Sequence, residues 1–329
     1  MPLLRRLFAA LDVFTAGILA CVVLGLVLPC YGAGAAAFKG LTQAAIVLLF
    51  FLYGVKLSRQ SVVQGLLHWR LQAMVFFFTF VFFPLFIPLT RPLFEPLVGA
   101  PLFMGLVYVA CLPSTVQSSI AFTSVAGGNV PAAVCAASVS SLLGVFLTPF
   151  LVSLLFATQG EGAAVGVDAV VKICSQVLLP FVLGQGAQRW LQPWVHRHKK
   201  LIGYNDKGTI WLVVYTSFSE ATAGGHWAQL QWSQLGGLLF TCLVLLCAIH
   251  ALTYTASRML GFRREDRIAI VFCGSKKSLA VGAPMMMVIF GTLDNNLLLP
   301  LMIFHQVQLM TCAHLANMWR KKGADNGGY

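Results

Sequence analysis

Two adjacent lysines, Lys276 and Lys277, stand inside an otherwise apolar stretch that runs from about residue 268 to 290. A charged side chain at the centre of a bilayer costs roughly 2.5–3.5 kcal/mol on insertion scales, and it usually faces a cavity, a partner or a substrate path. The segment from Gly274 to Ser278 contains poor helix formers, so a membrane helix is expected to break here. A charged, broken helix at mid-depth is typical of the binding site of a transporter.

The composition places the chain among polytopic membrane proteins. Of its 329 residues, 58% are hydrophobic and 10% are charged, and the mean hydropathy is +0.83. A soluble protein of this length would need more polar surface. The net charge of +12 comes from small basic clusters between apolar segments. We therefore expect the lipid bilayer as the surroundings and no nucleic-acid partner.

The apolar segments predict an all-α protein with ten transmembrane helices. Each segment approaches the roughly 20 residues that a helix needs to cross the hydrocarbon core. The segments are residues 11–30, 40–56, 71–91, 101–125, 130–157, 168–188, 208–223, 234–257, 267–290 and 296–318. In this scheme Lys276 follows Arg267 by nine residues. That spacing puts it about 13 Å into a core of about 30 Å.

The distribution of basic residues predicts the orientation. With the N-terminus in the cytoplasm, seventeen of the 22 Lys and Arg residues lie in inside loops and tails and three lie outside, the other two being the central lysines. This bias follows the positive-inside rule. We expect a multi-pass protein of the cell membrane, the plasma or inner membrane, with both termini cytoplasmic.

The chain reads as two repeats of five helices each, residues 1–160 and 161–329. The fourth and ninth segments share a pattern in which apolar residues lead to a Cys and then to a polar, helix-breaking knot around Pro113 and around Gly274. Because five is odd, the second half must lie inverted relative to the first. Inverted repeats with matched broken helices are associated with alternating access.

Three runs carry a resemblance to a known family, residues Leu112–Asn129, Val271–Ala280 and Leu301–Gln306. Over nearly the whole chain the sequence resembles the bile acid:sodium symporter family. The resemblance is strongest to its divergent orphan branch, which includes bacterial symporter-like members and the seventh human member. It implies a panel domain of helices 1, 2, 6 and 7 and a core domain of helices 3–5 and 8–10. It also implies that the broken fourth and ninth helices cross at the substrate and ion sites.

One departure from the family pattern concerns the coupling ion. Sodium-coupled members carry an acidic residue before the glycine of the ninth helix and a Gln-Asn pair after it. Aligned on Gly274, these positions fall on Phe272 and on Lys276-Lys277. Two cations without a carboxylate repel Na⁺. A lysine could instead act as a tethered surrogate for the ion, or alternate between charged and neutral forms. No cofactor is expected, and Na⁺ and H⁺ both stay open as the coupling ion.

The central lysines allow two interpretations. They could bind an anionic group, with Ser275 and Ser278 as neighbouring ligands. Alternatively, they form a structural pair whose ammonium groups bond to free carbonyls of the opposite broken helix. If the segment is unwound, both side chains can reach one cavity, whereas a regular helix would separate them by about 100°.

Polar residues accompany Pro113 at the matching break. Thr115, Gln117, Ser118 and Ser119 supply donors and acceptors there. They could be substrate or ion ligands, or satisfied polar residues in a helix interface. The N-termini of half-helices would add positive potential and favour an anion.

Two further sets of polar residues are candidates. His305, Gln308 and Cys312 share one helix face, where they could form interhelical hydrogen bonds or, through His305, a proton relay. A metal is not expected, because no second His or carboxylate has suitable spacing. Glu220, near the outer end of the seventh span, could be a gate, or could simply meet water.

The absence of a nucleophile–base pair, a metal cluster and a phosphate loop predicts that the chain is not an enzyme. The preferred function is a secondary transporter, a symporter of the bile acid:sodium type that moves a small organic anion by alternating access. The alternative is a membrane regulator of cation or calcium balance that uses the same fold, because the resemblance extends to eukaryotic members linked to calcium homeostasis. Nothing in the sequence predicts an oligomeric state.

Overall fold

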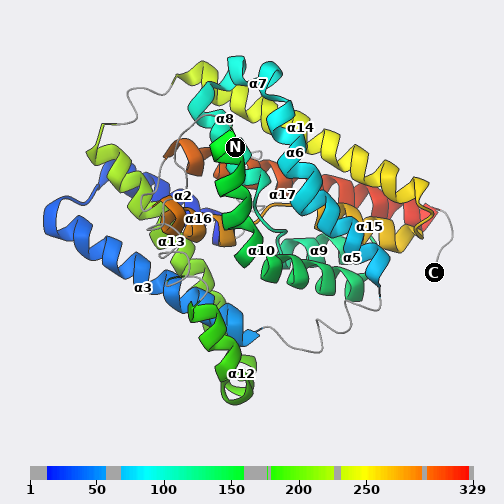
Figure 1. Cartoon of the computed structure of the whole chain (residues 1–329), viewed down its shortest axis with the longest axis horizontal. Coiled ribbons are helices and arrows are strands. Elements are labelled where there is room, and N and C mark those ends of the chain that lie inside the picture. Colours follow the sequence, from blue (N-terminus) through cyan, green and yellow to red (C-terminus); the bar gives the residue numbers. More distant parts are fainter. Residues whose placement is uncertain are drawn as a thin grey trace, which may run out of the picture. The chain divides into compact units, whose positions relative to one another are not determined.

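The structure is a computed structural model of the chain. It describes residues 13–56, 68–158, 176, 179–225, 231–290 and 295–325. Every regular element in these ranges is helical (Figure 1). The predicted all-α class is confirmed for this part of the chain.

The chain divides into two compact units, of which the first holds residues 1–56, 167–230 and 283–295. Its long helices are α2 (Val13–Val27), α3 (Gly32–Lys56), α12 (Leu179–Arg197) and α13 (Lys199–Ala223). Helix α3 packs along α12 and α13, and α13 also packs on α2 (Figure 1).

Glycines allow α3 and α12 to approach closely. A Cβ atom on Gly184 of α12 would collide with the carbonyl oxygen of Phe51 in α3, whereas a Cβ atom on Gly186 would meet nothing within 4 Å. We expect Gly184→Ala to lower the melting temperature of the purified protein, because overpacking typically costs about 1–3 kcal/mol. Gly186→Ala is the matched control, and it should stabilise slightly, since Ala favours helix over Gly by about 1 kcal/mol. Shifts of the same sign in both variants would contradict this packing.

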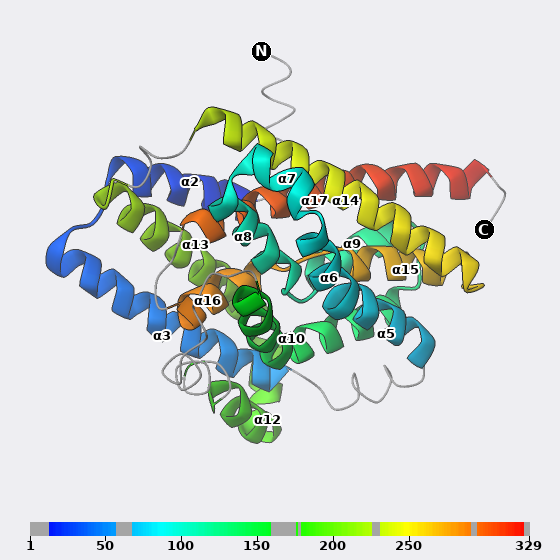
Figure 2. The ribbon, with the colours of Figure 1, turned by 45° about the horizontal axis from the view of Figure 1, so that its top comes forward.

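The second unit holds residues 57–166, 231–282 and 296–329. Its helices, in chain order, are α5 (Trp69–Phe76), the π-helix η1 (Phe77–Phe82), α6 (Phe83–Leu89), α7 (Arg91–Val98), α8 (Ala100–Ala110), α9 (Gln117–Val125), α10 (Val130–Thr158), α14 (Trp232–Met259), α15 (Arg264–Gly274) and nearly all of α17 (Asn295–Asp325). Helix α15 packs against α5, α9, α10 and α14 (Figure 2). The short α7 had no counterpart in the prediction. It precedes Gly99, whose φ of 84° starts the turn into α8.

Both predicted helix interruptions are present. Helix α8 ends at Ala110 and α9 begins at Gln117, so the first gap contains Pro113. Helix α15 ends at Gly274, and α16 (Leu279–Phe290) begins after a second gap that contains both lysines. The unit boundary falls inside α16.

Six helical segments of the described chain are long and apolar enough to cross a membrane: Gly32–Lys56, Trp69–Leu89, Val130–Thr158, Trp232–Met259, Arg264–Phe290 and Asn296–Lys321. Two shorter apolar helices cover Ala16–Val27 and Ala100–Ala110. The full set of ten spans and the inverted repeats stay predictions, and the predicted repeat boundary at residue 160 lies outside the described residues. The first unit holds α2, α3, α12 and α13 together with residues 283–295, so part of the ninth predicted segment lies outside the second unit.

Candidate functional site

The two helix interruptions contact each other within the second unit. The amide N–H of Ser278 donates to the carbonyl of Pro113 (2.9 Å). The hydroxyl of Ser119 donates to the carbonyl of Phe272 at the end of α15 (3.0 Å). The polar knots that the sequence placed far apart are therefore in direct contact.

The first gap leaves main-chain carbonyls without helical partners, as any helix end does. Side chains from other elements supply the donors. The ammonium of Lys277 donates to the carbonyls of Ala110 (2.7 Å) and Leu112 (2.9 Å). The hydroxyl of Thr148 in α10 donates to the carbonyl of Cys111 (2.8 Å). The broken segment is thus tied to both α10 and the second gap.

The third bond of the Lys277 ammonium goes to the carbonyl of Thr79 in η1 (2.7 Å). This carbonyl has no partner in its own helix because η1 has the i to i−5 bonding of a π-helix. The N–H of Phe83 bonds to Phe78, and the next residue, Pro84, has no N–H to donate. An ammonium has three N–H groups. Those of Lys277 are all used within the protein, as the structural interpretation of the lysines anticipated.

Lys276 has quite different surroundings. Its side chain is 0% exposed, and its Nζ has no hydrogen-bond partner among the described residues. The Nζ lies 4.0 Å from the ring centroid of Phe122 in α9 and 5.6 Å from that of Phe272. The two amines therefore contact different groups.

Gln308 in α17 binds the main chain of Lys277 on both sides of its Cα. Its Oε1 accepts the amide N–H of Lys277 (2.9 Å), and its Nε2 donates to the carbonyl of the same residue (2.8 Å). Together these two bonds fix the orientation of the Gln308 side-chain amide, with Oε1 toward the N–H and Nε2 toward the carbonyl. The second N–H of Nε2 faces Nδ1 of His305 (2.9 Å). Nδ1 must therefore accept, so His305 is neutral with its proton on Nε2. Gln308, on the predicted polar face of α17, thus forms hydrogen bonds to another segment, as expected. The role of His305 as a proton relay stays a prediction.

Helix α17 also contacts α14 through Cys312, whose Sγ lies 3.5 Å from Nε2 of His250. Among the residues that the structure describes, no group of His, Cys, Asp and Glu side chains could hold a metal ion.

The polar residues of the first break differ in accessibility. Ser119 and Thr115 are buried and share a hydroxyl network, in which Thr115 Oγ1 lies 2.8 Å from Ser118 and 3.2 Å from Ser119. Ser118 is partly exposed, and Gln117 at the start of α9 is exposed. The predicted ligands therefore divide into a buried structural pair and an accessible pair.

The hydroxyls of the two serines beside the lysines form hydrogen bonds at the helix ends. Ser275 donates its hydroxyl to the carbonyl of Val271 (2.6 Å), and the hydroxyl of Ser278 accepts the N–H of Val281 (3.3 Å) at the start of α16. Ser140 of α10 was not among the candidate site residues, and its hydroxyl accepts the N–H of Ser114 (3.0 Å).

Glu220 belongs to α13 of the first unit. Its carboxylate lies 3.8 Å from Nζ of Lys39, and both side chains are about one-third exposed. This partly solvated ion pair fits a residue that meets water. The proposed role as a gate stays a prediction.

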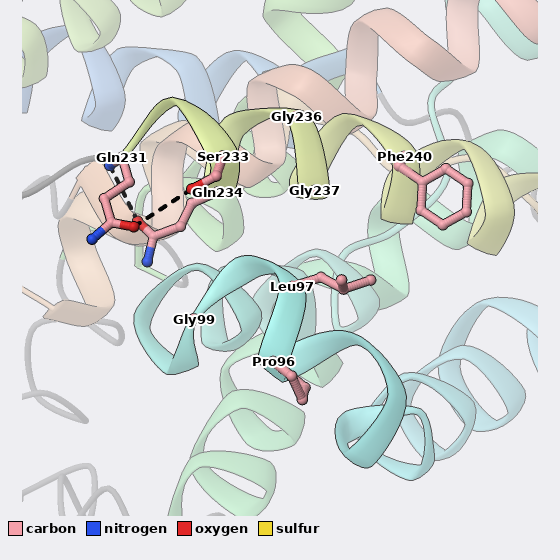
Figure 3. A pocket seen from close by; sticks show the side chains of 9 residues that line it. All are labelled: Pro96, Leu97, Gly99, Gln231, Ser233, Gln234, Gly236, Gly237 and Phe240. Carbon is pink, nitrogen blue, oxygen red and sulfur yellow. Dashed lines mark hydrogen bonds between the residues drawn. The ribbon is translucent and has the colours of Figure 1, made fainter.

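A surface groove of about 560 Å³ lies between the end of α7 and the start of α14 (Figure 3). Its lining comprises Pro96, Leu97, Gly99, Gln231, Ser233, Gln234, Gly236, Gly237 and Phe240. Gln231 and Gln234 form the capping box of α14, so their polar groups serve the helix start. None of the candidate site residues lines this groove.

Comparisons with known proteins show which family the chain belongs to. The sequence profile of the SBF-like CPA transporter family matches residues 12–321. The chain belongs to this family. It is 46% identical over 318 residues to the Putative symporter YfeH of Escherichia coli, covering 96% of this chain and 95% of that protein. It is 30% identical to the Sodium/bile acid cotransporter 7-B of Xenopus laevis, with 94% and 91% covered, and 29% identical to the Sodium/bile acid cotransporter 7 of Mus musculus, with 94% and 92% covered.

Family membership and the apolar helices together identify an integral, multi-pass membrane protein. The names of the family and of these relatives are names of transporters, not of enzymes. The resemblance to the bile acid:sodium symporter family is confirmed.

Proposed function

We propose that this SBF-like protein is a secondary transporter that moves a small organic anion by alternating access. One observation carries the proposal: the Lys276 side chain is fully buried, and its Nζ has neither a carboxylate nor a hydrogen-bonding partner in the described chain. An uncompensated buried charge is costly, and in membrane proteins such groups mark substrate paths. A bound anion would supply the missing partner charge.

The start of α9 is the place where the anion would bind. The first N–H groups of a helix lack partners within it and carry positive potential. Gln117 is exposed there and Ser118 is partly exposed, so both can reach a ligand. The Nζ of Lys276 contacts the ring of Phe122 in the same helix, so its charge adds to that potential. The anionic group would accept N–H and hydroxyl donors while this positive field attracts it.

The ion that couples to transport follows from the same residues. Two lysines and no carboxylate stand in the second gap, which argues against Na⁺ binding there. We therefore propose H⁺ coupling or anion exchange. We also propose ten membrane helices in two inverted repeats. From the bias of the basic residues, we place the protein in the cell (inner) membrane with both termini cytoplasmic.

The test is ligand-induced thermal stabilisation of the purified protein. Taurocholate and small carboxylates and sulfonates would be screened in NaCl and in choline chloride, at acidic and neutral pH. A ligand at 100 times its Kd stabilises by about 2.7 kcal/mol. We expect an anion to raise the melting temperature of the wild type, but not of Lys276→Met, with or without Na⁺.

Lys321→Met is the matched control, because it removes an exposed lysine from the same unit. It should respond as the wild type does. Equal stabilisation of Lys276→Met would overturn the site. A response to Ca²⁺ or Na⁺ alone, with every anion inactive, would instead favour a regulator of cation balance.

A further inference from the structure

We propose that the carbonyls of Thr79, Ala110 and Leu112 form a monovalent-cation site that the ammonium of Lys277 permanently fills. The three oxygens lie 2.7, 2.7 and 2.9 Å from Nζ. The ring of Phe83 adds a further face, with its centroid 4.3 Å from Nζ. The side chain is 0% exposed, so the site is shielded from bulk solvent.

The site is built by the main chain rather than by the lysine. Ala110 is the last residue of α8 and Leu112 lies in the gap after it, so their carbonyls have no place in a regular helix ladder. The carbonyl of Thr79 is freed by Pro84. Three converging carbonyl dipoles without a cation would be buried, unsatisfied acceptors. Groups of main-chain carbonyls are the ligands that channels use for monovalent cations.

The contrast with Lys276 supports this assignment. The adjacent lysine is equally buried, yet the described residues supply it with aromatic rings and with no hydrogen-bond acceptor. Burial of a lysine does not by itself gather carbonyls around the amine. At the Lys277 position, therefore, the protein carries its own cation, and Na⁺ or K⁺ from solution has no vacant place there. This inference concerns stability and does not depend on the proposed transport function.

The experiment is chemical rescue of Lys277→Ala. The substitution removes the side chain beyond Cβ, leaving a space that n-propylammonium can fill. We expect the melting temperature of Lys277→Ala to fall by more than about 5 °C, because three buried acceptors lose their donors. Millimolar n-propylammonium should then raise it in a concentration-dependent way, as binding to the folded state requires.

Three controls separate cation binding from other effects. n-Propanol has a similar size but no charge, and tetramethylammonium has charge but no N–H donor, so neither should rescue. Lys277→Met keeps a long side chain that fills the space, so it should be destabilised but not rescued. If Lys277→Ala is too unstable to purify, the same titration applies to Lys276→Met/Lys277→Ala, in which the uncompensated charge is removed.

The proposal is supported if n-propylammonium stabilises the alanine variant and leaves the wild type and Lys277→Met unchanged. It is overturned if n-propylammonium shifts all three proteins equally. It is also overturned if Lys277→Met melts within about 1 °C of the wild type, since the carbonyls would then need no cation.

Discussion

Lys276→Met is expected to raise the melting temperature of the ligand-free protein, and Lys277→Met is expected to lower it. The two positions are adjacent and equally buried, so burial alone predicts the same sign for both. The contacts predict opposite signs. The ammonium of Lys276 pays for desolvation without a hydrogen bond, and replacing such buried charges with apolar groups can stabilise by about 1–4 kcal/mol. Met also packs well against the rings of Phe122 and Phe272.

Lys277→Met removes three donors and leaves three buried carbonyls without partners. Each unsatisfied group costs about 1–3 kcal/mol, so this loss should exceed any gain from removing the charge. Thermal melting in detergent measures both shifts. Lys321→Met, at an exposed position, should leave the melting temperature unchanged. Destabilisation in both variants would mean that Lys276 has a partner charge or bond in the ligand-free protein. Stabilisation in both would mean that the carbonyls do not need the ammonium.

If Lys276→Met raises the stability of the ligand-free protein but removes anion binding, the two effects have one physical cause. A cation without a partner lowers the stability of the empty protein and favours the state in which an anion is bound. Strained or unpaired groups of this kind are tolerated where function requires them. The cost is smaller for Lys277 in the ligand-free structure, because its three N–H groups are all hydrogen-bonded.

The sequence predicted the helix interruptions because the residue types there disfavour helix. Pro113 lacks an N–H, and Gly274 starts a run of residues that form helix poorly. Two lysines in an apolar stretch also marked the right segment, since so few charges can lie at that depth. These signals are local, and both gaps appear where they were expected.

The different roles of the two lysines could not be predicted from the sequence. Both are the same residue type in the same gap, and their roles depend on which distant groups face them. The decisive partner, the carbonyl of Thr79, lies 198 positions before Lys277 in the chain. It belongs to a π-helix, which leaves it without a helical hydrogen bond. Pro84 was visible in the sequence, but π-helices are rare and the tertiary contact decides whether the freed carbonyl matters. Gln117 likewise needed the structure to separate it from the buried Ser119.

Gln308→Leu is expected to cause a second large loss of stability. The substitution keeps the approximate volume but removes both bonds to the main chain of Lys277, so a buried N–H and a buried C=O lose their partners. At about 1–3 kcal/mol for each group, the melting temperature should fall markedly. Gln306→Leu is the matched control, two residues earlier on the same helix with a partly exposed side chain, and it should change little.

The Gln308 variants also test how the gap is held in position. Gln308→Asn retains the amide but shortens the side chain by one methylene, so it cannot keep both bonds without moving the main chain. If Gln308 positions the lysines, Gln308→Asn should lose both stability and anion-induced stabilisation, nearly as Gln308→Leu does. Thermal melting with and without the anion separates these two losses. Wild-type behaviour of the Asn variant would show that segment 275–278 is held by its contacts with the first gap alone, chiefly the bond from Ser278 to Pro113.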